Sequence, residues 1–177
     1  MDVLDRQEAK PASYPIAPFN LTAAAEALDH NMIWSRIESY ISHRWTEREV
    51  IWIVEGDGNW QPDLTPASVT AVEKWSNYAW ASETLNPSPL GGYELTGTGP
   101  YRFTATVGSG TVPADVKEAF RRLAEYVVET TTEKPGSSSE AYDIGSLKVE
   151  FHRSASWLGR TMQNSGAADL LRPYRRI

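Results

Sequence analysis

The spacing of apolar residues changes twice along the chain, and this change limits the folds that are open to it. From residue 33 to residue 45, apolar side chains recur every three or four positions, which is the period of an amphipathic helix. Between residues 49 and 108, β-branched and aromatic segments are separated by Gly and Pro turns, and apolar and polar residues alternate with a period of two over 101–107, as in an antiparallel sheet. Helical spacing returns over residues 112–130. The pattern predicts an α+β fold, in which a small helical bundle carries an inserted antiparallel β-sheet.

We expect three regions built around one compact domain, because a chain of 177 residues can bury most of its apolar surface in a single core. Near the start lie Pro11, Pro15 and Pro18, and each proline disfavours a helical conformation in the residue before it. The predicted regions are an extended N-terminal arm (1–19), a single domain (20–165) with helices at 20–45 and 112–130 and the β region at 49–108, and a C-terminal tail (166–177) that is extended or helical.

Residues that carry enzyme chemistry are absent or scattered. The chain has no cysteine, which excludes disulfides, thiolate metal sites and thiol nucleophiles. The three histidines, His30, His43 and His152, fall in different predicted elements, and the glycine pairs lack the Lys-Ser/Thr of a phosphate loop. We therefore expect no enzyme activity, no catalytic or metal-binding residues and no cofactor.

Charge is distributed unevenly along the sequence. The net charge is −6, yet the segment from Glu150 to Ile177 contains five arginines and only two acidic residues. An acidic body repels the phosphates of nucleic acid, so we expect it to tolerate nearby DNA without binding it tightly. No apolar run approaches the roughly 20 residues of a membrane-spanning helix, and we expect no membrane partner.

Large aromatic residues cluster in the β region. Trp52, Trp60, Trp75, Tyr78 and Trp80 all lie there, and core packing is the ordinary use of such side chains. Five large rings are many for a small domain to bury, and exposed aromatic rings anchor protein interfaces or stack on sugars. We expect some of these rings to contact a partner.

The chain ends in SGAADLLRPYRRI, where apolar and basic residues are concentrated. Such a composition favours an interaction segment, in which leucines and a tyrosine enter apolar pockets while arginines pair with acids of a partner. The alternative is a tail that caps only the core of its own chain.

Three segments, taken in order, resemble the head-to-tail adaptor (connector) proteins of long-tailed phages and gene transfer agents. In the first, a strand from Phe103 ends in a glycine turn and leads into Val-Pro-Ala-Asp-Val at residues 112–116. The second is Asp-Ile-Gly-Ser-Leu at residues 143–147, and the third runs from Gly166 to Arg176. The resemblance covers the second half of the chain well and the N-terminal helices only in outline.

The resemblance implies a structural virion protein at the head–tail interface, assembled in the host cytoplasm. About twelve copies would form a ring beneath the portal protein, extend the DNA channel and dock a tail terminator or stopper protein. DNA would pass through the ring without sequence recognition.

The resemblance also implies that the C-terminal segment binds the portal. The residues expected to do so are Leu170, Leu171, Arg172, Tyr174, Arg175 and Arg176. The resemblance does not extend residue by residue over the Trp-rich sheet, so an inter-subunit or tail interface of Trp52, Trp60, Trp75 and Trp80 is expected from their clustering alone. An aromatic-rich carbohydrate- or protein-binding module remains the alternative function.

Overall fold

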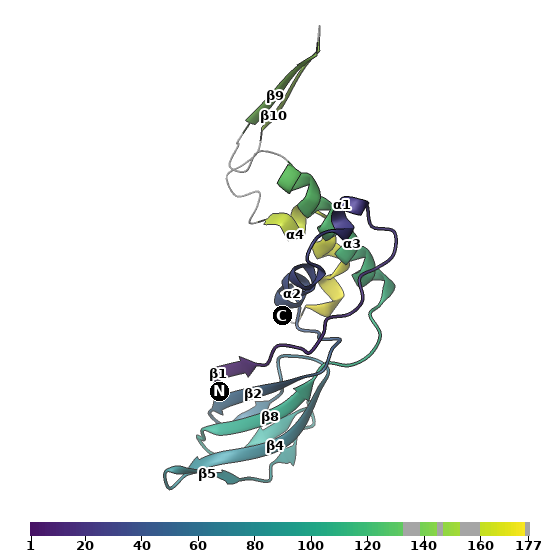
Figure 1. The fold of residues 1–177 in the computed structure, drawn as a ribbon. Coiled ribbons are helices and arrows are strands. Elements are labelled where there is room, and N and C mark those ends of the chain that lie inside the picture. The colour runs from purple at the N-terminus through teal and green to yellow at the C-terminus, as the bar shows by residue number, and fades with distance from the viewer. Residues whose placement is uncertain (133–138, 145–146, 153–159, 176–177) are drawn as a thin grey trace. The chain divides into compact units, whose positions relative to one another are not determined.

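The computed structural model describes the backbone of residues 1–132, 139–144, 147–152 and 160–175, and the side chains of residues 1–129 and 160–175. Helices and antiparallel sheets are both present, which confirms the predicted α+β class. The chain divides into two compact units instead of the single predicted domain (Figure 1). We call them the β unit, residues 1–15 and 42–111, and the helical unit, residues 16–41 and 112–175.

Two antiparallel sheets make up the β unit. The larger has the strand order β1-β2-β8-β4-β5 and the smaller the order β3-β7-β6. The strands are β1 (Asp2–Glu8), β2 (Arg48–Glu55), β3 (Gly58–Trp60), β4 (Ala67–Ser76), β5 (Ala79–Ser82), β6 (Asn86–Pro87), β7 (Tyr93–Leu95) and β8 (Tyr101–Val107). The predicted β region is thus confirmed. The N-terminal arm, which we expected to be extended, is extended over residues 2–8, where it pairs with β2 along the edge of the larger sheet.

The core of the β unit lies between its two sheets. Alternate residues of β2 and β8 are buried, which is the period-two pattern of strands with one covered face. Trp60 of the smaller sheet stacks on Phe103 of the larger one, with 3.9 Å between ring centroids, and meets Trp52 edge-on at 5.8 Å. These aromatic contacts join the sheets.

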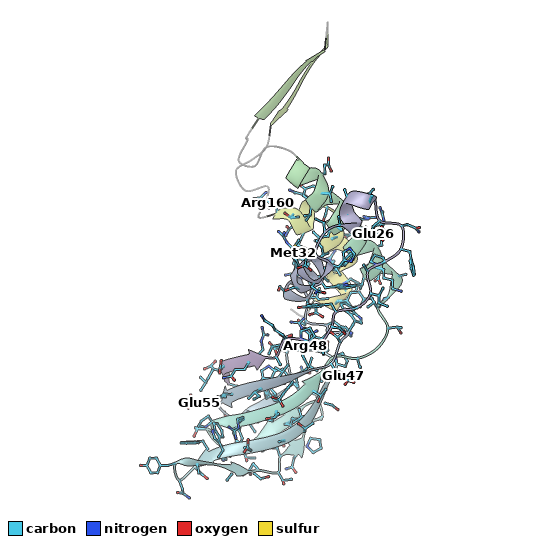
Figure 2. All side chains as sticks on the ribbon, viewed as in Figure 1. Glu26, Met32, Glu47, Arg48, Glu55 and Arg160 are labelled. Atoms are coloured by element: carbon cyan, nitrogen blue, oxygen red, sulfur yellow. The ribbon has the colours of Figure 1, made fainter. Side chains whose placement is uncertain are left out.

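A shared carboxylate fixes β1 to the start of β2. Glu8 accepts hydrogen bonds from Arg44 Nε at 2.7 Å and from Arg48 Nη1 at 3.1 Å. The two arginine side chains are only 6% and 3% exposed. Burial raises the pKa of Glu8, but the hydrogen bond and charge of Arg44, together with Arg48, outweigh this and hold it below its ordinary value. Figure 2 shows Arg48 and Glu55 at the two ends of β2.

The helical unit contains α1 (Ala23–Glu26), α2 (His30–Tyr40), α3 (Ala114–Thr132), α4 (Thr161–Asn164), α5 (Ala167–Leu170) and the 3-10 helix η2 (Arg172–Tyr174). It also contains the antiparallel pair β9 (Ser139–Ile144) and β10 (Leu147–His152). The predicted helix at 112–130 is confirmed, and its apolar stripe is buried against α2, where Trp34 packs on Phe120 at 4.8 Å.

The sequence predicts two helices within residues 20–45, and two are present, although both are shorter than the predicted range. The Asp29 side chain accepts a hydrogen bond from the Asn31 N–H and caps α2. Thr22 caps α1, and α2 ends at Tyr40.

We predict that Glu8→Ala lowers the free energy of unfolding of the β unit by about 3 kcal/mol, because it leaves two buried guanidinium groups without their carboxylate. Glu55→Ala removes an exposed acid from the other end of β2 and should change this free energy by less than about 0.5 kcal/mol. Urea denaturation followed by near-UV circular dichroism measures both. Equal effects would show that the ion cluster contributes nothing particular.

The lowered pKa of Glu8 also predicts a pH dependence. The stabilising effect of the ionised carboxylate is complete above the pKa of an unfolded glutamate and is lost as the pH falls through the lower pKa of the folded state. Between these two values the wild type should lose stability more steeply than Glu8→Gln, as measured by urea denaturation across that acid range. Parallel curves would contradict the assignment.

Candidate interaction surfaces

The C-terminal segment folds back on its own helical unit. Gly166 adopts a left-handed conformation (φ 72°) between α4 and α5, and α5 packs against α3. Leu171 is fully buried. The Tyr174 hydroxyl donates to Asp115 at 3.1 Å, and burial, with this hydrogen bond, raises the tyrosine pKa. Arg175 donates to the Tyr40 hydroxyl at 3.2 Å and lies over its ring at 4.6 Å.

These contacts divide the six residues expected to bind a portal. Leu171 is a core residue with no surface to offer in this conformation, so its expected insertion into a partner pocket is corrected. Tyr174 is half-buried, with its hydroxyl engaged, and acts as an anchor within the unit. Leu170 is half-buried, Arg172 and Arg175 are exposed, and Arg176 lies outside the described residues.

Neither exposed arginine is neutralised by a carboxylate. No ion pair joins Arg172 or Arg175 to an acid among the described residues, whereas Arg121 and Arg122 both pair with Glu118. An exposed arginine can make two parallel hydrogen bonds to a carboxylate or phosphate of a partner. The exposed surface of the C-terminal segment therefore includes Arg172 and Arg175 beside the partly exposed Leu170, together with the acid Asp169.

The four tryptophans expected at an interface also separate into two pairs. Trp52 and Trp60 belong to the core of the β unit, and the Trp52 indole N–H donates to Asp63 at 2.8 Å, so their expected interface role is corrected. Trp75 is 40% exposed, and Trp80 is half-buried.

Trp75 and Trp80 lie opposite each other on the β4–β5 hairpin. Their rings meet edge-on, with centroids 5.2 Å apart and planes inclined by 65°. The Arg102 guanidinium lies 4.7 Å over the Trp80 ring and is held there by Glu73 at 2.6 Å. One face of Trp80 is thus covered, and the two rings do not form a flat platform.

The turn between these strands contains a tyrosine that we did not assign to a site from the sequence. Asn77 and Tyr78 both have positive φ, 49° and 62°, and Tyr78 is 94% exposed. Two-residue turns with two positive φ values favour Asn-Gly, since glycine has no Cβ to strain. The sequence signal that could have identified this exposed turn was Asn77 followed by the bulky Tyr78, midway between Trp75 and Trp80.

A groove lies in the helical unit between residues 18–20 and the first two turns of α3, with a volume of about 410 Å³. Phe19 forms part of its wall and is 88% exposed. Lys117 and Arg121 add positive charge on the opposite side. Hydrogen bonds from Arg121 and Arg122 lower the pKa of Glu118 to about 2, so this acid is ionised and holds Arg121 in place.

The two histidines whose side chains are described, His30 and His43, lie in different units. His30 meets Phe120 edge-on at 5.7 Å, and burial and Arg44 lower the pKa of His43. The side chain of His152 is outside the described set. Within the described residues, no three His, Asp or Glu side chains come together as a metal site would require.

No protein-family model, curated protein or solved structure matches the chain. None of the helices in the described ranges combines the length and apolar character that crossing a bilayer requires.

We predict that Leu171→Ala lowers the free energy of unfolding of the helical unit by about 2–5 kcal/mol, because it opens a cavity beneath α5. Its neighbour Leu170→Ala is the matched control and should cost less than about 1 kcal/mol, since that side chain is partly in water. Urea denaturation followed by helical circular dichroism distinguishes them. If both variants unfolded alike, the orientation of α5 would be wrong.

Proposed function

We propose that the protein is a head-to-tail adaptor, a structural protein whose copies form a ring beneath a portal and dock the next tail component. Support comes first from the order of the resembling segments. Strand β8 ends at Val107, a turn follows, and α3 begins at Ala114. Gly108 in this turn has φ 102°, and a Cβ there would approach Thr46 O to 2.3 Å, so the turn requires glycine.

The observation that carries the proposal is that some residues of the C-terminal segment anchor it to the helical unit while others remain exposed for contact. Leu171 and Tyr174 fix the segment to its own unit, while Arg172 and Arg175 remain on the surface and form no ion pair with any acid whose side chain the structure describes. Because the buried Leu171 fixes the backbone that carries the two arginines, binding would have to order their side chains but not the segment itself. This arrangement suits docking to an acidic surface of the portal, with Leu170 adding apolar contact.

Each contact is individually weak, and the ring makes it effective. One ion pair between an exposed arginine and an acid of the portal contributes about 0–1 kcal/mol to the free energy of binding. The copies in a ring bind together, so the contributions of all copies act jointly. The acidic balance of the chain, with a net charge of −6, favours passage of DNA over its retention. The tail-side partner would be a terminator or stopper protein, and the site of action the virion neck.

Binding to the portal ring encoded with this chain tests the proposal. We predict that native mass spectrometry detects saturation near one chain per portal subunit. Arg172→Glu with Arg175→Glu should weaken binding by roughly tenfold or more, because two attractive contacts become repulsive. Removal of the whole segment would be uninformative, since Ala167 and Leu171 belong to the core.

The matched control is Lys10→Glu with Arg160→Glu, which makes the same charge change at two other exposed positions. It should leave portal binding unchanged. If both double variants weakened portal binding equally, the effect would come from overall charge and not from Arg172 and Arg175. If the wild type did not bind the portal at all, the adaptor function would be refuted.

A further inference from the structure

The turn of the β4–β5 hairpin contains a residue that disfavours the backbone conformation of the turn. Tyr78 occupies a left-handed position that glycine fills most easily, and it is almost fully exposed. A strained and solvated aromatic side chain contributes nothing to the core, so the stability of the β unit does not explain it. Strain of this kind is retained where a side chain is needed for contact.

The hairpin end reaches past the strand that supports it. The register of β4 with β8 runs from Ala67 to Lys74, the Trp75 N–H donates to Pro100 O at 2.9 Å just before β8 begins, and the rest of the hairpin lies beyond this last bond. Figure 1 shows the end of the β4–β5 hairpin at its lower left. From Trp75 to Ser82 the chain contains no charged residue. We call Trp75, Asn77, Tyr78 and Trp80 the aromatic tip.

The geometry of the aromatic tip favours a protein pocket over a sugar. Stacking on a sugar uses an open aromatic face, but the Trp75 and Trp80 planes are inclined by 65°, and Arg102 covers one face of Trp80. A projecting, uncharged tip fits a concave surface that has apolar walls.

The groove beside α3 is concave, and Pro18, Phe19 and Ala114 give it an apolar part beside the charged Lys117, Glu118 and Arg121. Its volume of about 410 Å³ lies in the range of pockets that enclose small ligands, which is sufficient for an aromatic side chain. The exposed ring of Phe19 offers an aromatic partner, and Lys117 offers a cation for the face of a tyrosine ring.

We propose that the aromatic tip of one copy inserts into the α3 groove of a second copy. The two surfaces differ, so the contact is head-to-tail, and each copy can bind one neighbour with its tip and another with its groove. Contacts of this type close into a ring when the rotation between copies permits. The inference deepens the proposed function, since it names the surfaces that would join the ring, but its test requires no portal.

A contact of this size buries less area than the roughly 1,200 Å² of a standard interface, so pairwise association is weak and rises with concentration. Tyr78→Gly tests the tip, because an Asn-Gly turn should fold at least as well as Asn-Tyr. Phe19→Ser tests the groove at a side chain that is 88% exposed. Leu90→Ser is the control, since Leu90 is exposed and apolar but belongs to neither surface.

Size-exclusion chromatography with light scattering and native mass spectrometry should detect oligomers of the wild type and of Leu90→Ser. Tyr78→Gly alone and Phe19→Ser alone should be monomeric, with a melting temperature for Tyr78→Gly equal to or above that of the wild type. Mixed together, the two variants should form a one-to-one dimer and nothing larger, because only one intact tip and one intact groove can meet.

Three results would overturn the inference: a wild type that stays monomeric at its highest soluble concentration, Tyr78→Gly oligomers like those of the wild type, or no dimer in the mixture. Glycan-array binding that disappears in Tyr78→Gly, with no self-association of the wild type, would assign the tip to carbohydrate instead. Portal binding is measured with Arg172 and Arg175 variants, so failure of the adaptor function and failure of this contact are distinguishable.

Discussion

The β unit depends on the carboxylate of Glu8, which accepts hydrogen bonds from the buried guanidinium groups of Arg44 and Arg48. These residues lie close in sequence to two of the places where the chain passes between the β unit and the helical unit. Without Glu8, the buried Arg44 and Arg48 would both lose a carboxylate that accepts hydrogen bonds from them, and breaking a buried ion pair in this way is strongly destabilising. The cluster fixes the first strand to the sheet edge and the start of β2 at the same time. The aromatic contacts of Trp60 then join the second sheet to the first.

The spacing of apolar residues along the sequence predicts the helices and strands. An element with one buried face shows apolar residues at every second position in a strand and at every third or fourth position in a helix. This spacing does not predict the division into two units, which depends on the separate packing of strands and helices. Nor does it distinguish Leu170 from Leu171, adjacent residues of which only one can face α3. Trp52 and Trp75 look alike in sequence, but only the former lies where the second sheet covers the strand.

The same physical reasoning accounts for what remains on the surface. Apolar residues of the C-terminal segment are used to anchor it, so the arginines that project from it are well positioned for electrostatic contact. In the β unit, Trp52 and Trp60 are buried in the core. Trp75 and Trp80 lie with Tyr78 at the end of the β4–β5 hairpin. Under the proposed adaptor function, each of these two surfaces would contact a different neighbour.

Electron microscopy of the negatively stained complex between the full chain and its cognate portal tests the central claim most directly. The account predicts class averages in which added density forms a ring coaxial with the portal and has the same rotational symmetry. Unchanged portal rings beside free chains, at concentrations that saturate any weak contact, would contradict it.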